Sequence, residues 1–287
     1  MKVTIVGSGN GGCAIAAVLS MKGHDVSILK LGHHIHNENF YSLQKTKTIR
    51  LLGIEGEGTF TLLNVTTDPQ EAINGADSIF IFYVTNYHSI VAEKICPYLL
   101  EHQCVILGPG YLGSLIFERT MRSMNNSKIP LFAELETLPY SSRIIKPGVV
   151  NISSRNIRHP FASYPSSRAH EIVEKLTPLI GTVFKRHHLI EVALHNPNLA
   201  IHTLGVLMNI SRVEHPNKDF ALYKDGFTPS MWNLVAQLDG EKMDVLERLN
   251  LPRIPYFDAF RFRTFEDVTI DSIKGFMHYA NEAPAGP

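Results

Sequence analysis

Short apolar runs alternate with longer segments of helical spacing through the first half of the chain. The runs predict β-strands at Val3–Val6, Val26–Leu29, Ser78–Val84, Cys104–Leu107 and Pro130–Ala133. The intervening segments predict helices at Cys13–Lys22, Asp68–Asn74, Ser89–Leu100 and Gly113–Met124. In the second of these, Asp68 is the expected N-cap and Pro69 the first helical residue. Such repeated alternation of strand and helix predicts a parallel, doubly wound sheet.

The second half of the chain changes character after about residue 190, where β-branched runs become sparse. Before that point, Gly53–Thr61 predicts a small hairpin or loop, and the helix Arg168–Leu179 joins later strands at Val149–Ile152 and Gly181–Phe184. Beyond it, helical spacing dominates at Asn198–Ser211, Ser230–Leu249 and Thr269–Ala280. We therefore predict an α/β domain at 1–188 and an all-helical domain at 189–287.

A glycine-rich turn joins the first predicted strand to the first predicted helix, in the sequence Gly7-Ser-Gly9-Asn10-Gly11-Gly12. In a strand–turn–helix context this pattern is typical of a Rossmann-type dinucleotide site. Gly7 would permit the tight turn, Gly9 would let backbone N–H groups approach a pyrophosphate, and Gly12 would let helix and strand pack closely. The helix amino terminus supplies positive partial charge to the phosphates. The alternative is a tight turn that binds nothing.

The end of the second predicted strand bears on which dinucleotide is bound. An acidic residue there usually holds the ribose 2′-hydroxyl of NAD, but this region reads Ile28-Leu-Lys30-Leu-Gly-His33-His34. Lys30 would suit a 2′-phosphate better than a bare hydroxyl. We therefore favour NADP(H) over NAD(H), with a solvated Lys30 as the alternative.

Composition excludes several classes of partner. Lysine and arginine number 27, aspartate and glutamate also 27, so the zero net charge argues against a nucleic-acid or polybasic membrane partner. The three cysteines show no Cys-x-x-Cys spacing, which favours a reducing compartment. No apolar stretch reaches the ~18 residues needed to span a bilayer. The first strand begins at residue 2, which leaves no room for a signal peptide, and we expect a cytoplasmic protein.

Ligands of open parallel sheets bind beyond the carboxyl ends of the strands. Three such ends carry suggestive segments, at Val84–His88, Leu107–Gly113 and Glu134–Tyr140. We expect Thr85, Pro109 and Gly110 to border the cofactor, although ordinary turn chemistry also explains these residue types.

His202 is the candidate acid/base group, because carbonyl or imine reduction needs a proton donor and histidine titrates in the right range. It lies in an apolar helical context four residues after Asn198, at the junction of the predicted domains. A hydrogen-bonded core histidine is the alternative. His195 and the pair His187/His188 are expected to be structural or exposed. The pairs His33/His34 and His187/His188 lack the spacing and carboxylate company of a metal site, so none is predicted.

Several segments together resemble the octopine/nopaline (opine) dehydrogenase family, in order and over essentially the whole chain. They are Gly7–Gly12, Leu107–Gly113, Glu136-Thr-Leu-Pro-Tyr140 with Arg143, Asn196-Pro-Asn198 to His202, Leu207–Asn209, Tyr223–Pro229 and Leu238–Met243. The Glu-Thr-Leu-Pro-Tyr and Asn-Pro-Asn segments are far more specific than the glycine turn.

The resemblance implies an enzyme that joins an amino acid to a 2-oxo acid and reduces the resulting imine with NAD(P)H. It implies that His202 is the acid/base and that Tyr111, Glu136 and Thr137 line the substrate cleft, with Asn198 nearby. Tyr111 departs from the polar amide expected in some members, which bears on amino-acid selectivity. Arg143 is a candidate partner for the substrate carboxylates, with a surface salt bridge as its alternative role. The sequence does not fix the oligomeric state, and a homodimer stays open.

One departure concerns a family segment of the form Arg-Tyr-x-x-Glu-Asp, which follows a Gly-Pro step and supplies the aspartate that orients the histidine. The sequence ends at Pro287, where that segment would begin. We expect either a truncated chain or a member that orients His202 by other means.

Two alternative functions stay open at this point. A 2-dehydropantoate reductase or related 2-oxo-acid reductase would share both domains, but such enzymes rely on a lysine near the domain junction, and none occurs in Glu191–Arg212. A non-catalytic NADP(H)-binding sensor would need neither the lysine of the reductases nor the aspartate that orients the histidine.

Overall fold

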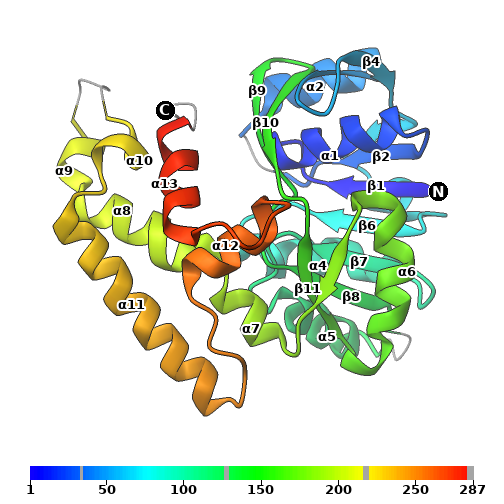
Figure 1. Cartoon of the computed structure of the whole chain (residues 1–287). Helices are drawn as coiled ribbons and strands as arrows, with labels where there is room; N and C mark the ends of the chain where they lie inside the picture. Colours follow the sequence, from blue (N-terminus) through cyan, green and yellow to red (C-terminus); the bar gives the residue numbers. More distant parts are fainter. Residues whose placement is uncertain (33–34, 126–128, 216–219, 283–287) are drawn as a thin grey trace. The chain divides into compact units, whose positions relative to one another are not determined.

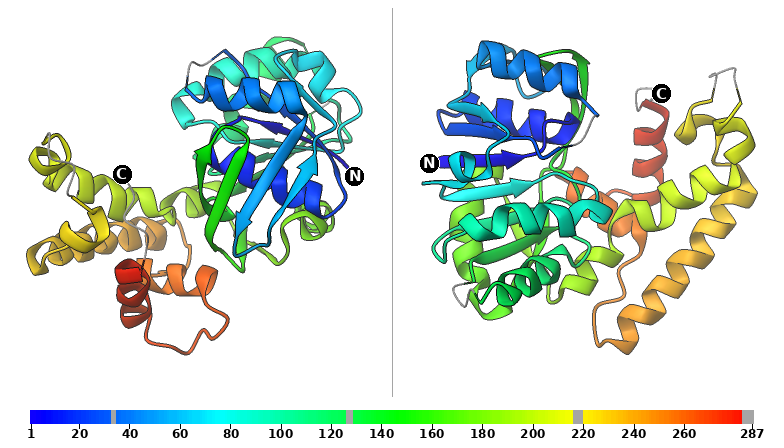
Figure 2. Two further views of the ribbon diagram at one scale, coloured as in Figure 1. Left: turned by 90° about the horizontal axis from the view of Figure 1, so that it is seen from above. Right: turned by 180° about the vertical axis from the view of Figure 1, so that it is seen from behind.

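The computed structural model describes residues 1–32, 35–125, 129–215 and 220–282 (Figures 1 and 2). The chain divides into two compact units, Met1–Ala193 and Leu194–Pro287. The predicted boundary falls between residues 188 and 189, so the division places most of helix α7 (Leu189–Leu194) in the first unit. The pair His33/His34 lies outside the described residues.

The main sheet of the first unit has eight strands, in the order β12-β11-β8-β7-β6-β1-β2-β5. Their bounds are β1 Lys2–Val6, β2 Asp25–Leu29, β5 Asn64–Thr66, β6 Ser78–Ile81, β7 Cys104–Leu107, β8 Leu131–Leu135, β11 His159–Tyr164 and β12 Val183–Lys185. The six strands from β5 to β8 are mutually parallel, whereas β11 pairs antiparallel with β8. Those six have the strand order of a doubly wound nucleotide-binding sheet. The predicted Rossmann-type fold class is confirmed.

A second, four-stranded sheet has the order β4-β3-β10-β9. Its strands are β3 Thr48–Gly53, β4 Gly58–Thr61, β9 Tyr140–Lys146 and β10 Val149–Arg155. The hairpin predicted near Gly53–Thr61 is confirmed as the β3–β4 connection. The strand predicted at Val149–Ile152 also forms, but as part of β10 in this sheet rather than in the main one.

Helix α1 (Asn10–Met21) contacts strands of both sheets, including β1 and β2 of the main sheet and β9 and β3 of the second (Figure 1). All of its residues from Gly12 to Leu19 are buried. A helix that is apolar on every side must be covered on every side. The second sheet provides that cover, which explains the unbroken Cys-Ala-Ile-Ala-Ala-Val-Leu sequence.

Helices cover both faces of the main sheet, and each face has its own hydrophobic core. One core includes residues of α1, α2 (Asn37–Thr46) and α6 (Ala169–Ile180). The other includes residues of α3 (Pro69–Ile73), α4 (His88–Ile95) and α5 (Gly113–Ser123). Short 3₁₀ turns occur at η1 (Thr85–Tyr87), η2 (Cys96–Tyr98) and η3 (Ser166–Arg168). The predicted cap of α3 is confirmed, because the Asp68 carboxylate accepts from the N–H groups of Gln70 (2.8 Å) and Glu71 (3.2 Å).

The described part of the second unit is helical. Its elements are a π-helical turn η4 (Asn198–His202), α8 (Thr203–Met208), α9 (Ile210–Val213), α10 (Leu222–Asp225), α11 (Pro229–Arg248), α12 (Tyr256–Thr264) and α13 (Ser272–Glu282). An aromatic core centres on Tyr256, Phe260 and Phe276. The helices predicted at Ser230–Leu249 and Thr269–Ala280 are confirmed as α11 and α13, although α13 begins at Ser272 rather than at Thr269.

The helix predicted over Asn198–Ser211 forms in η4, α8 and the start of α9, but it is interrupted at Asn209. Asn209 leaves the helical region with φ −118° and ψ 21°. Its side-chain amide donates to the carbonyls of Gly205 (2.9 Å) and Gly226 (3.2 Å). Asparagine side chains compete with helical hydrogen bonds in this way.

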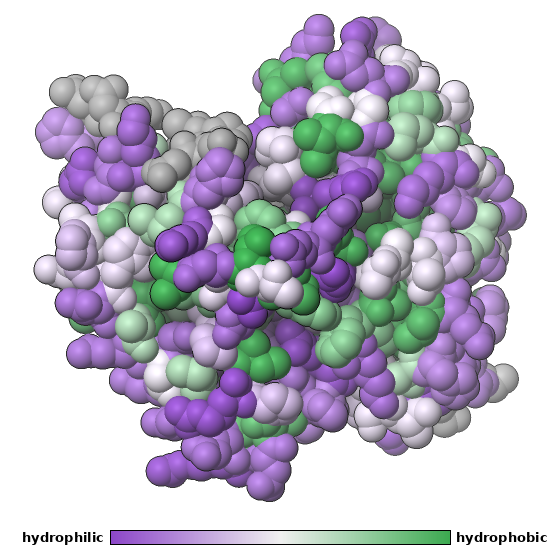
Figure 3. Space-filling model, in the orientation of Figure 1, coloured by the Kyte–Doolittle hydropathy of each residue, from purple (hydrophilic) through white to green (hydrophobic). Residues whose placement is uncertain are grey.

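Hydrophilic residues predominate on the face shown in Figure 3, and hydrophobic residues occur there in small groups. Scattered exposed apolar residues are normal on a folded protein. None of the described helices is both long enough and apolar enough to cross a membrane. The described residues also hold no group of three or more histidine, cysteine, aspartate or glutamate side chains arranged to bind a metal ion.

His159, on β11, generates a prediction about pH. It is 5% exposed, and burial lowers its pKa to about 4, although a hydrogen bond to the backbone of Ile180 acts in the opposite sense. The ordinary pKa of histidine, expected in the unfolded chain, is 6.5. Between pH 6.5 and about 4 the unfolded chain therefore binds a proton that the folded chain does not, so stability is lost as the pH falls through this window. One pH unit is worth about 1.4 kcal/mol, so acidification from pH 7 to 5 should remove about 2 kcal/mol through this residue.

Urea unfolding of the chain and of a His159→Gln variant at pH 7 and 5 measures this contribution. The variant should lose less unfolding free energy on acidification than the unmodified chain does. Equal losses would show that His159 does not titrate as its burial requires.

Candidate functional site

The glycine turn after β1 has the geometry predicted from its sequence. Gly7 has φ +124°, a conformation that side chains rarely adopt, and a Cβ there would lie 2.7 Å from the Phe82 carbonyl oxygen. A Cβ on Gly12 would lie 2.0 Å from the Gly7 carbonyl oxygen. Both contacts are impossible for a larger residue, so these glycines are required for β1 and α1 to approach this closely.

The amino terminus of α1 suits a phosphate. Gly9, the N-cap, has extended backbone and provides no side-chain cap, and the first turn holds no acidic residue. Backbone N–H groups and the helix dipole therefore favour an anion here. A Cβ on Gly9 would lie 3.3 Å from the His36 ring, and one on Gly11 would lie 3.1 Å from Leu138. The absence of side chains keeps this helix end narrow and accessible to a dinucleotide, which is the group that these residues fit.

Asn10 has a structural role that the sequence does not reveal. Its side-chain oxygen accepts from the N–H of Ile144 (2.8 Å), and its carbonyl accepts from the Ser142 hydroxyl (3.1 Å). Both partners lie on β9. Asn10 therefore ties the start of α1 to the second sheet, and its predicted contact with the cofactor stays a prediction.

Lys30 follows β2, as predicted, but it is only 6% exposed. Its ammonium group donates to the Ile35 carbonyl (2.6 Å) and lies 6.0 Å from the Phe40 ring centroid. Burial lowers the pKa of Lys30. Burial, and then the charge of Lys30, also lower the pKa of His36. The His36 ring lies against Gly9, and because its pKa is lowered it is neutral near pH 7, so Lys30 is the cation of this pair.

Glu134 holds the loop after β7, which contains Gly108-Pro109-Gly110. The sequence did not predict this role of Glu134. Its buried carboxylate accepts from the N–H groups of Leu112 and Ser114, at 2.8 Å each, and from the Ser114 hydroxyl. Burial raises the pKa of Glu134, whereas its bonds with Ser114 and Leu112 act in the opposite sense. A Cβ on Gly110 would lie 2.3 Å from this carboxylate. The loop can approach Glu134 this closely only because residue 110 is glycine.

His88 joins the loops after β6 and β7. It follows Thr85 in the chain, is fully buried, and its Nε2–H donates to the Tyr83 carbonyl (3.1 Å). A Cβ on Gly113 would lie 2.4 Å from the other ring nitrogen of His88. Burial lowers the pKa of His88, which favours the neutral ring. The predicted cofactor residues Thr85, Pro109 and Gly110 therefore lie on loops held by buried polar groups.

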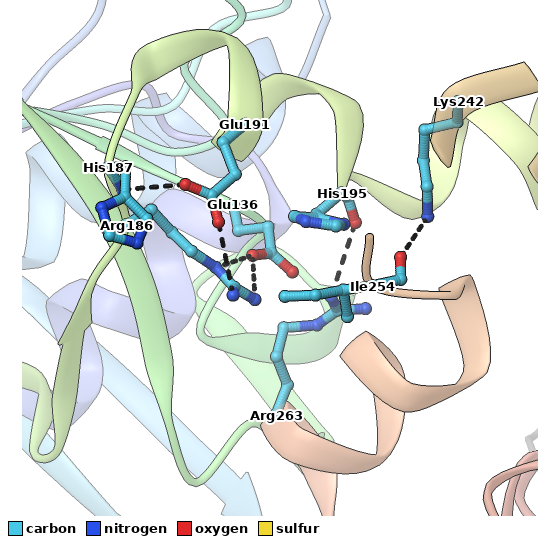
Figure 4. Close-up of polar contacts among 8 residues, drawn as sticks. All are labelled: Glu136, Arg186, His187, Glu191, His195, Lys242, Ile254 and Arg263. Carbon is cyan, nitrogen blue, oxygen red and sulfur yellow. Dashed lines mark hydrogen bonds and ion pairs between the residues drawn. The ribbon is translucent and has the colours of Figure 1, made fainter. Parts of the chain in front are cut away.

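Glu136, a predicted substrate residue, is fully buried in an ion-pair cluster (Figure 4). The Arg186 guanidinium lies between two carboxylates, 3.2 Å from Glu136 and 3.6 Å from Glu191. Glu191 also accepts from the backbone N–H of His187 (2.8 Å). Neither Arg186 nor Glu191 was predicted, and the pairing of Arg186 with Glu136 joins residues 50 apart in the chain. A contact of Glu136 with substrate stays a prediction.

The other predicted substrate residues of the first unit are more accessible. Thr137 is half-buried, and Tyr111 adopts a left-handed conformation with φ 48°. Arg143 is exposed on β9 and donates to the Ser142 carbonyl (3.0 Å). No ion pair joins Arg143 to a carboxylate in the described part of the chain. The salt bridge considered as its alternative role does not form there.

His202 lies in a small polar cluster within the second unit. One ring nitrogen, Nδ1, is hydrogen-bonded to the side-chain oxygen of Asn198, and the other, Nε2, lies 2.7 Å from the Tyr223 hydroxyl. Burial lowers the pKa of His202 and raises that of Tyr223. The predicted pair Asn198 and His202 is therefore brought together by the π-helical turn. Tyr223 was not predicted as a site residue, although the Tyr223–Pro229 segment contains it.

Arg263 and Lys242 make further polar contacts within the second unit, and Figure 4 shows those with backbone carbonyls. The buried Arg263 side chain donates to the carbonyl of His195 at 3.5 Å. Lys242 pairs with Asp239 at 2.5 Å and donates to the Ile254 carbonyl at 2.9 Å. His195 is buried, as expected of a structural histidine.

Two family models match the chain, one in each half. Residues 185–286 match the model described as NAD/NADP octopine/nopaline dehydrogenase, alpha-helical domain. Residues 2–111 match the model described as NAD-dependent glycerol-3-phosphate dehydrogenase N-terminus. Among curated proteins, the chain is 29% identical over 256 residues to an opine dehydrogenase from Arthrobacter sp. (strain 1C), covering 87% of this chain and 69% of that protein.

Solved structures share the fold over the full length of the chain. An octopine dehydrogenase in complex with NADH and agmatine matches with a TM-score of 0.73 and 16% identity, covering 100% of this chain and 76% of its own. A yersinopine dehydrogenase with NADP+ bound matches with a TM-score of 0.74 and 14% identity, covering 100% and 72%. A ketopantoate reductase from Ralstonia eutropha JMP134 matches with a TM-score of 0.57 and 17% identity, covering 99% and 92%. At 14–17% identity, each of these three structures shows the fold alone.

The glycine turn, the helical-domain match and the curated relative agree with the resemblance seen in the sequence. The helical domain of this chain matches the octopine/nopaline dehydrogenase model, and the chain is similar to opine dehydrogenases, which indicates an NAD(P)-dependent oxidoreductase of the kind that acts on CH–NH bonds.

Proposed function

We propose that this protein condenses an amino acid with a 2-oxo acid and reduces the resulting imine to an N-(carboxyalkyl) amino acid. The observation that carries the proposal is the His202 cluster, in which a half-buried imidazole is held by Asn198 and Tyr223. A half-buried imidazole with a lowered pKa and fixed hydrogen-bond partners is a candidate acid/base group. The curated relative and the octopine dehydrogenase structures support the same reaction class.

The first unit has the residues to hold a nicotinamide dinucleotide. The uncapped amino terminus of α1 would bind the pyrophosphate, and Gly7 and Gly12 set the position of that helix. The loops that Glu134 and His88 hold in place would border the rest of the molecule. When bound, the reduced coenzyme supplies the hydride that the imine carbon receives.

His202 would carry the protons of the reaction. As an imidazolium it polarises the oxo-acid carbonyl, then gives its proton to the oxygen that leaves as water when the amine forms the imine. Burial lowers the pKa of His202, so the proton is readily released. Both substrates carry carboxylates, and the exposed Arg143 is the proposed cationic partner for one of them.

We further propose that the coenzyme is NADP(H). The region after β2 contains no carboxylate to hold a ribose 2′-hydroxyl, and Lys30 supplies a cation near His36, whose ring lies against Gly9. The solved yersinopine dehydrogenase binds NADP+. Lys30 donates to the Ile35 carbonyl, a bond that a 2′-phosphate would replace or share.

An oxidation assay separates the proposed function from its alternatives. NADPH should be consumed with pyruvate only when an amino acid from a panel is present. Consumption with ketopantoate alone would favour a 2-oxo-acid reductase, and tight NADPH binding with neither activity would favour a sensor. In the same assay, His202→Gln should lower turnover by ~10²–10⁴-fold, while replacement of the exposed His170 by Gln should not. Unchanged turnover in His202→Gln would remove this histidine from the mechanism.

The coenzyme proposal is tested by affinity ratios. Loss of one charged partner of a phosphate costs about 1.5–3 kcal/mol, which is roughly a tenfold or greater loss of affinity. Lys30→Gln should therefore weaken NADPH binding about tenfold or more while NADH binding changes little. The exposed Lys45→Gln serves as the control and should change neither. Equal affinity of the unmodified chain for NADH and NADPH would contradict the proposal.

A further inference from the structure

Both ring nitrogens of His202 are engaged within the second unit. Nδ1 is bonded to the Asn198 side-chain oxygen, and Nε2 lies 2.7 Å from the hydroxyl of Tyr223. Asn198 and His202 belong to η4, whereas Tyr223 belongs to α10. The ring is therefore held from two separate elements, which restricts its rotation.

The chemistry of these partners determines which nitrogen carries the proton of the neutral ring. A side-chain amide oxygen can only accept, so the nitrogen that faces it must be the N–H donor. Nδ1 therefore carries the proton, and Nε2 presents a lone pair. A phenol hydroxyl can donate to that lone pair. All three groups are then satisfied in a single arrangement, the Nδ1–H tautomer.

The Tyr223 ring is itself fixed by aromatic neighbours. Its centroid lies 6.1 Å from Phe227 and 6.1 Å from Phe276, and 6.4 Å from Tyr279. It also meets the His202 ring edge-on, at 5.9 Å between centroids. Phe276 and Tyr279 belong to α13, and Phe227 follows α10. This aromatic packing holds the Tyr223 ring in place, with its hydroxyl next to Nε2.

We propose that Tyr223 is a positioning residue for His202, which holds the neutral imidazole as the Nδ1–H tautomer and makes Nε2 the nitrogen that gains and loses the proton. This inference rests on the proposed acid/base role of His202. Without substrate the Tyr223 hydroxyl donates to Nε2, and it gives up that bond when Nε2 transfers a proton to or from the substrate. Nδ1 keeps its proton and its bond to Asn198 throughout. A fixed tautomer matters because the wrong one places a proton where a base needs a lone pair.

The test is nitrogen NMR of the full chain labelled with ¹⁵N-histidine, with His202→Gln used to assign the His202 signals. At a pH where the ring is neutral, the unmodified chain should show a protonated Nδ1 and an unprotonated Nε2. Tyr223→Phe, which keeps the aromatic ring and removes only the hydroxyl, should raise the minor Nε2–H population measurably, while the Asn198 oxygen still favours Nδ1–H. Its turnover should fall about 10–100-fold, with little change in thermal stability.

Tyr279→Phe is the matched control, because Tyr279 packs on Tyr223 and no hydrogen bond joins it to His202 among the described residues. It should leave both the tautomer and turnover unchanged. An Nε2–H tautomer in the unmodified chain would overturn the inference without any variant. So would a Tyr223→Phe variant with an unchanged tautomer. Failure of the proposed function is a separate result, because full turnover in His202→Gln leaves the tautomer measurement intact.

Discussion

The contact between Gly12 and the carbonyl of Gly7 is the constraint on which the rest of the first unit depends. No side chain can stand at residue 12, because its Cβ would lie 2.0 Å from that oxygen. The contact brings α1 against β1, and the amino terminus of α1 then lies at the carboxyl end of the strand. In a doubly wound sheet this is the end where ligands bind. The second sheet covers the opposite side of α1, and Asn10 fastens the first turn of the helix to β9.

Buried polar groups fix the conformation of the loops that neighbour the glycine turn. Glu134 satisfies backbone N–H groups at the start of α5, and His88 donates to the chain that leaves β6. Burying such groups is costly unless they are hydrogen-bonded. Once bonded, they hold the loops in one conformation, which is the preorganisation that a binding site needs. In the second unit, the His202 imidazole is likewise held by hydrogen bonds, to the Asn198 amide and the Tyr223 phenol.

The sequence predicts most of the main sheet and the site motifs because those signals are local. The glycine turn, the cap at Asp68 and the four-residue spacing of Asn198 and His202 each lie within a few residues of one another. Strand β9 was missed because its sequence, Tyr-Ser-Ser-Arg-Ile-Ile-Lys, has few apolar residues, and its partners are distant in the chain. The ion pair of Arg186 with Glu136 and the contact of the Tyr223 hydroxyl with His202 were also missed because the partners are distant in the chain. The break at Asn209 depends on a bond to Gly226, which no local pattern reveals.

The most direct test of the central claim follows the hydride. NADPH deuterated at the transferring carbon is incubated with the protein, a 2-oxo acid and an amino acid, and the products are analysed by mass spectrometry. The account predicts an N-(carboxyalkyl) amino acid with one deuterium on the carbon that was the oxo-acid carbonyl. Deuterium found only in a 2-hydroxy acid, formed whether or not the amino acid is present, would contradict it.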